Sequence, residues 1–172
     1  MRETLPADDE APAYYFKYIE LVPRGDICAI LETQRSEIPD WLSGISDEQS
    51  RFCHAPAAWS IREVVGHVND TERVLAFRAF WFARRFDAPL PSFEQTIAAQ
   101  HAGADVRAWA SLLEEFRAIR GSTLAFFQHL PPDAWKRGGI ASDHRFTVRA
   151  LASIIAGHTI HHLGLLKQRL PG

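Results

Sequence analysis

The strongest hydrophobic pattern in the chain runs from Phe146 to Leu170, FTVRALASIIAGHTIHHLGLLKQRL. Apolar residues recur there at intervals of three and four, which predicts a long amphipathic helix. His158 and His162 are four residues apart, so both imidazoles lie near the middle of the apolar face, one turn from each other. His161 is roughly 80° from the centre of that face. Two neighbouring histidines are therefore directed at the protein core.

A second helical pattern begins after Ser60, because Ser60 and Glu63 have the spacing of a capping box. No proline interrupts the following residues, so we predict one helix that ends near Phe86, before Pro89. Its apolar face carries His67. This helix therefore also directs a histidine at the core.

Two further amphipathic segments complete the pattern. Asp26 is the expected N-cap of a helix that Pro39 should end or kink. Another helix is expected to open near Asp105 and to stop at Pro131. Four such helices without a convincing strand pattern predict an all-α four-helix bundle in a single domain, residues 1–172.

The remaining segments are predicted to connect or flank these helices. Residues 1–12 are polar and acidic and predict a loose N-terminal arm. The aromatic residues Tyr14, Tyr15, Phe16 and Tyr18 suggest that the end of the arm is pinned against the body, and a mobile aromatic cluster is the alternative. A long connection separates the second and third helices, with a short helix expected around residues 93–100. Residues 133–145, which include Gly138 and Gly139, predict a loop.

Composition narrows the class of protein. The chain of 172 residues has 47% apolar residues and a formal net charge of −2, with acidic and basic residues interspersed. The absence of a basic run argues against a nucleic-acid partner. No apolar run approaches the roughly 20 residues that span a bilayer, and the first residues lack the apolar stretch of a signal peptide. We therefore expect a cytoplasmic protein with no membrane partner, in which Cys28 is a buried structural thiol.

The histidines supply the candidate chemistry. A lone histidine on an apolar face is usually a hydrogen-bonded core residue, but a pair four residues apart can place two nitrogens on one divalent ion. Two ligands make a weak site, so a third must come from elsewhere, and His67 is the natural candidate. Whether His161, Asp70 or Glu72 joins the site stays open.

The sequence carries no Walker or dinucleotide glycine pattern, no Cys-x-x-Cys and no serine elbow. Phosphate-binding and serine-hydrolase functions therefore have no support.

Three stretches together resemble the DinB/YfiT-like superfamily: WSIREVVGHVNDTERV near residue 60, RAFWFAR ending at Arg84, and VRALASIIAGHTIHHLGLLKQRL at the end of the chain. The resemblance spans about residues 21–170. It implies a bundle that holds a divalent metal with one histidine of the second helix and an H-x-x-x-H pair of the fourth. In this sequence those positions are His67, His158 and His162, and zinc or nickel is the expected metal.

The resemblance implies more than one function. It points first to an S-transferase that uses a low-molecular-weight thiol, and second to a metal-dependent hydrolase, each with a small-molecule substrate. A binding module with a structural metal is the non-catalytic alternative. A coordination position open to solvent or a small molecule would favour an enzyme, whereas a fourth protein ligand would favour the structural role. The aromatic surplus of the second helix, including Phe77 and Phe80, is compatible with a homodimer.

Overall fold

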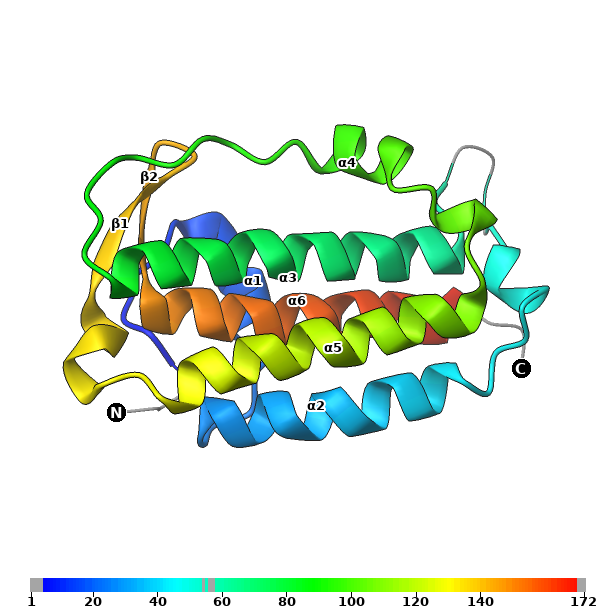
Figure 1. The fold of residues 1–172 in the computed structure, drawn as a ribbon, viewed down its shortest axis with the longest axis horizontal. Helices are drawn as coiled ribbons and strands as arrows, with labels where there is room; N and C mark the ends of the chain where they lie inside the picture. Colours follow the sequence, from blue (N-terminus) through cyan, green and yellow to red (C-terminus); the bar gives the residue numbers. More distant parts are fainter. Residues whose placement is uncertain (1–4, 54, 56–57, 170–172) are drawn as a thin grey trace.

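Four long helices lie side by side along the longest axis of the molecule (Figure 1). The computed structural model describes residues 5–53, 55 and 58–169. The long helices are α2 (Ile27–Leu42), α3 (Ile61–Ala83), α5 (Trp109–Gln128) and α6 (Val148–Arg169). Both α2 and α3 pack against α5 and α6, so the first two long helices occupy opposite corners of the bundle. This is the all-α four-helix bundle that the sequence predicts.

Shorter elements surround the bundle. A helical segment behind α3 and α6 in Figure 1 consists of a 3₁₀ turn (Ala13–Tyr15) and α1 (Phe16–Ile19). The predicted connection helix is α4 (Gln95–His101), which lies outside α3. A hairpin of β1 (Gly138–Ala141) and β2 (His144–Thr147) closes one end. Further 3₁₀ turns cover Gln49–Arg51, Ala104–Val106 and Pro132–Lys136.

The start of α3 confirms the predicted capping box. The Ser60 hydroxyl accepts a hydrogen bond from the Glu63 amide at 3.2 Å, and the Glu63 carboxylate accepts one from the Ser60 amide at 2.8 Å. The helix ends at Ala83, before the predicted Phe86, because Arg85 adopts a positive φ of 63° that a right-handed helix cannot continue.

The helices on either side depart from their predicted limits by about one turn. Asp26 caps α2 as predicted, through a 2.8 Å hydrogen bond from the Cys28 amide. Pro39 was expected to end or kink this helix, and it does not end it, because α2 continues to Leu42. Proline there forfeits one backbone hydrogen bond, while burial of Leu42 in the core favours the extra turn. The third long helix begins at Trp109 rather than near Asp105, which lies in a 3₁₀ turn.

The hairpin corrects the prediction of a loop over residues 133–145. Gly138 pairs with Thr147 and Ala141 with His144, in antiparallel register. The two residues between the strands have the positive φ angles of a tight hairpin turn, 51° and 63°. They are Ser142 and Asp143 rather than the usual Asn-Gly, so the sequence carries little signal of the turn.

The N-terminal residues are held more firmly than the prediction of a loose arm allowed. The first four residues lie outside the described part of the chain, but Glu10 is buried and accepts hydrogen bonds from the Thr147 hydroxyl and the Arg149 guanidinium. The predicted pinning of the tyrosines is confirmed, since the Tyr15 ring lies 5.1 Å from that of Phe146. The arm prediction is therefore wrong for Glu10.

One close backbone contact seats α1 on α6. A Cβ atom at Gly157 would lie 2.0 Å from the carbonyl oxygen of Tyr18, a separation that real side chains do not reach. Only glycine at this position allows the two helices to approach so closely. The N-terminal segment is thereby held beside His158.

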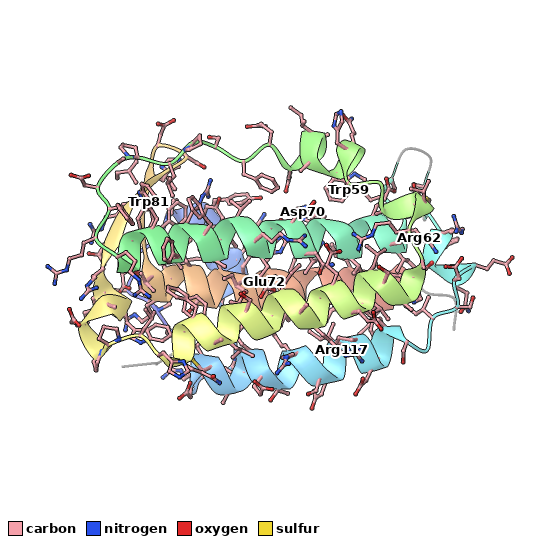
Figure 2. The ribbon with its side chains drawn as sticks, viewed as in Figure 1. Trp59, Arg62, Asp70, Glu72, Trp81 and Arg117 are labelled. Atoms are coloured by element: carbon pink, nitrogen blue, oxygen red, sulfur yellow. The ribbon has the colours of Figure 1, made fainter. Side chains whose placement is uncertain are left out.

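The core consists of two apolar clusters with a polar layer between them. Arg120 lies in this layer and donates to Glu72, Gln34 and Thr159, so that all four long helices contribute a residue. Figure 2 labels Glu72 where α3 faces α5. The apolar clusters on either side include Leu31, Leu75, Phe127 and Ile155 toward the hairpin, and Leu42, Val64, Leu112 and Leu166 toward the other end.

Two predictions from composition can be compared with the structure. None of the described helices is both long and apolar enough to cross a membrane. Cys28 is buried, as predicted, whereas Cys53 is exposed, and no disulfide joins them.

Candidate metal centre

Three imidazoles converge where α3 faces α6. The Nε2 atom of His158 lies 3.1 Å from Nε2 of His67 and 3.1 Å from Nε2 of His162. One ring nitrogen from each histidine lies within 4.8 Å of the others. The structure thus brings together the three residues that the sequence singled out.

The bundle geometry explains why these rings meet. Helices α3 and α6 pack along their lengths, and the four-residue spacing puts His158 and His162 on the side of α6 that faces His67. The Trp59 ring lies 4.9 Å from that of His67, and the Tyr18 ring lies 5.3 Å from that of His158. Figure 2 shows Trp59 beside the first turns of α3. Aromatic rings therefore cover two sides of the cluster.

Burial keeps the imidazoles in the form that binds metals. It lowers the pKa of His67 to about 4, and together with the neighbouring positive groups it places the pKa of His158 well below its usual value. Both rings are accordingly neutral at pH 7. The Thr71 hydroxyl lies 3.4 Å from Nδ1 of His67, where it can accept that nitrogen's hydrogen and leave the Nε2 lone pair directed at the other two rings.

The nitrogen spacing fits a single ion. Two nitrogens bound to tetrahedral zinc at about 2.0–2.1 Å are about 3.3 Å apart. The observed separations of 3.1 Å are close to this value. Imidazole nitrogens are common ligands of zinc, so three ring nitrogens at these separations fit a divalent metal. That these histidines are ligands stays a prediction.

The residues left open by the sequence do not join the cluster. Asp70 forms a 3.1 Å ion pair with Arg73, and Glu72 is engaged by Arg120 in the polar layer. His161 is half-buried and lies outside the group of converging nitrogens. Within the described part of the chain, no carboxylate or thiol accompanies the three imidazoles.

A cavity of about 300 Å³ reaches His158 from the side of α1. Its wall includes Tyr15, Tyr18 and Arg78, for which the sequence predicted no role at the site. A signal for Arg78 was available, because eleven residues separate it from His67, or about three helical turns, which puts both on one face of α3. The tyrosines carried no comparable signal, because α1 reaches the cavity only through its tertiary contact with α6.

Comparison with known proteins identifies the family. A model of the DinB superfamily matches residues 30–166. YfiT from Bacillus subtilis, described as a probable metal-dependent hydrolase with an unusual four-helix bundle topology, superposes with a TM-score of 0.75 at 15% identity, over 96% of this chain and 91% of that chain. A DinB-like protein from Bacillus subtilis, YjoA, superposes with a TM-score of 0.60 at 19% identity, over 84% of this chain and 88% of that chain. No curated protein gives a significant match. At these identities the two structures establish a shared fold.

Proposed function

Because the chain belongs to the DinB superfamily and gathers three histidines at one point of its bundle, we propose that it is a metal-dependent enzyme that transfers a low-molecular-weight thiol to an electrophile. One observation carries this proposal. The imidazole cluster borders a cavity that reaches His158, and no fourth ligand joins the cluster among the described residues. An accessible, incompletely ligated ion favours chemistry over a purely structural role.

The chain's own residues have distinct roles in this proposal. His67, His158 and His162 would hold the ion through their ring nitrogens, while Thr71 orients the His67 ring. A divalent ion held there supplies undiminished positive charge, which lowers the pKa of a thiol or a water beside it. The Tyr18 ring, packed against His158, restricts access of bulk water to the reacting sulfur.

The surroundings of the cluster favour a thiol over a water as nucleophile. Hydrolysis usually employs a general base within hydrogen-bond reach of the attacking water. The nearest acidic residues in sequence are engaged elsewhere, Asp70 with Arg73 and Glu72 with Arg120. A thiolate requires no such base, because sulfur is already a strong nucleophile once ionised.

Turnover with several thiols would test the proposal. Zinc-loaded and nickel-loaded protein is mixed with cysteine, glutathione or coenzyme A and a chlorodinitrobenzene. Sulfur attacks the carbon that bears chlorine, the carbon–chlorine bond breaks with its electrons leaving on chloride, and the thiol proton passes to buffer. We expect at least one thiol to react faster than without protein, and His162→Ala to abolish the gain. The same substitution at His144, on the hairpin, should leave it intact.

A metal-dependent hydrolase is the second candidate. The observation in its favour is the likeness to YfiT, which is described as a probable enzyme of that kind. Hydrolysis of activated esters or amides that depends on metal and on His162, with no thiol transfer, would favour this candidate. If neither activity depends on metal while the ion is bound, the non-catalytic binding module takes their place.

The metal, the assembly and the location are further parts of the proposal. Zinc or nickel suits a set of imidazole ligands, and elemental analysis of protein purified without a metal column would identify the ion. Phe77 and Phe80 are 50% and 39% exposed, which supports a homodimer through this face of α3. Sedimentation of the wild type and of Phe77→Ser would test it. A cytoplasmic location stays a prediction.

A further inference from the structure

The cavity beside the imidazole cluster has a second polar end. Arg78 lines it from α3, and the tyrosines of the N-terminal segment and Ser142 at the tip of the hairpin complete that end. From this arrangement we propose that the substrate carries a carboxylate, which binds Arg78 while its reacting group lies at His158. This inference rests on the proposed function, since it names a substrate class for the same site.

Arg78 is a buried cation with neutral partners. The residue is 4% exposed. Its guanidinium donates at 2.9 Å to the carbonyl oxygen of Pro91 and at 2.9 Å to the hydroxyl of Ser142, and Tyr15 lines the same cavity. Among the described residues, no carboxylate lies within ion-pair distance of it. These contacts orient the guanidinium but leave its charge uncompensated.

The other buried arginines of the described chain differ from Arg78 in this respect. Arg120 forms a 2.8 Å ion pair with Glu72, and Arg62 forms a 2.9 Å ion pair with Asp47. Among the buried arginines of the described chain, only Arg78, which lines the cavity, lacks a carboxylate partner. A carboxylate on the ligand would supply the missing charge, and the planar fork of arginine can bind both of its oxygens.

The size and the remaining charges of the cavity agree with a small anionic ligand. A volume of about 300 Å³ is at the lower limit for small-molecule sites. The Lys17 ammonium lies 4.8 Å from the centroid of the Tyr18 ring, which lines the cavity, and adds positive charge nearby. Glu94 also lines the cavity, but it is exposed. The buried end is therefore positive, and solvent screens the one acidic group at the wall.

Matched thiols can test this inference by calorimetry rather than by activity. Mercaptopropionate and mercaptopropanol differ in a carboxylate against a hydroxyl. We expect zinc-loaded wild-type protein to bind the carboxylate about tenfold or more tightly than the alcohol, because a hydrogen bond to a charged group is stronger than one between neutral groups. Equal affinities for the two probes in the wild type would overturn the inference without any variant.

Substitutions then test whether Arg78 causes the preference for the carboxylate over the alcohol. Arg78→Met should abolish it and leave the affinity for mercaptopropanol unchanged. Arg73→Met, the same change at an exposed position of the same helix, should retain it. If Arg78→Met does not fold, Arg78→Lys keeps a charge but loses the fork, and should reduce the preference to less than a third. A preference that survives every folded Arg78 variant would contradict the assignment.

A metal-free arm separates this inference from the proposed function. Glutarate has no thiol, and we expect it to bind metal-free wild-type protein but not metal-free Arg78→Met. Glutarate binding in a protein that takes up no metal would refute the proposed function and uphold the carboxylate site. Thiol transfer in a protein that binds the carboxylate and the alcohol equally well would uphold the proposed function and refute the carboxylate site.

Discussion

Replacing Glu72 by alanine should destabilise the protein by about 3–5 kcal/mol, the usual cost of leaving one member of a buried ion pair alone. The Glu72 carboxylate accepts two hydrogen bonds of 2.8 Å and one of 3.0 Å from Arg120. Both side chains are at most 3% exposed, so water cannot replace the lost carboxylate. Gln34 and Thr159 still contact the guanidinium but do not neutralise it.

Asp70 provides the matched control. It lies two residues from Glu72 on α3, and its ion pair with Arg73 is 3.1 Å long, but the two side chains are 30% and 48% exposed. Exposed pairs contribute about 0–1 kcal/mol, because water solvates each partner after the pair is broken. Asp70→Ala should therefore cost far less than Glu72→Ala, although each variant removes one acidic side chain from the same helix.

Urea denaturation followed by circular dichroism can measure both changes. Metal-free protein is used so that ion binding does not contribute to the free energy of unfolding. For a chain of this size each kcal/mol corresponds to about 2–4 °C, so Glu72→Ala should melt about 6–20 °C lower than the wild type. Replacing the whole pair, as Glu72→Leu with Arg120→Met, should recover most of the loss. A Glu72→Ala variant as stable as Asp70→Ala would refute the reasoning.

Three further predictions follow from features of the bundle. Removing metal should lower the melting temperature of the wild type, because an ion that binds only the folded form stabilises that form. His158→Ala should lose this response to metal, and His144→Ala should keep it. Melting curves recorded with and without a chelator can measure both. Burial alone would raise the pKa of Glu10, but hydrogen bonds from its arginine and threonine partners outweigh burial, so the pKa is lowered. The Glu10 carboxylate therefore stabilises the fold at pH values above its unfolded pKa of about 4.3, and this stabilisation is lost as the pH falls further. Urea titrations between about pH 5 and pH 3 should therefore show a smaller loss of stability in Glu10→Gln than in the wild type. Gly157→Ala should cost about 1–3 kcal/mol by pushing α1 off α6, whereas Gly164→Ala, on the same helix with open space around it, should be neutral or stabilising. Equal melting temperatures for the two glycine variants would contradict the close-contact argument.

Much of the fold could be predicted because it depends on local signals. The capping box at Ser60 and the N-cap at Asp26 fix the starts of two long helices, and helical periodicity marks the faces that pack. The histidines belong to the same class of signal. Their positions on apolar faces were readable from spacing alone, so their convergence followed once α3 and α6 packed together.

The rest depends on contacts between residues distant in sequence. The sequence left open whether Glu72 joins the histidines, and only its partner on α5 makes it part of the core. Pro39 is a local stop signal that burial of Leu42 outweighs. The Ser142 turn has no typical hairpin sequence, yet its tip reaches a neighbouring arginine. Such features are set by tertiary packing, which no local pattern encodes.

Two parts of the chain line the cavity: the bundle helices, and the N-terminal segment that the close contact at Gly157 holds against α6. The three histidines lie within residues 30–166, the part of the chain that the DinB superfamily model matches, whereas Tyr15 and Tyr18, which line the cavity, precede it. Substitutions at these tyrosines would therefore change the cavity wall without altering the three imidazoles. Relatives with the same three imidazoles need not accept the same molecule, and exchanging the first 26 residues between two of them should carry part of the substrate preference from one to the other.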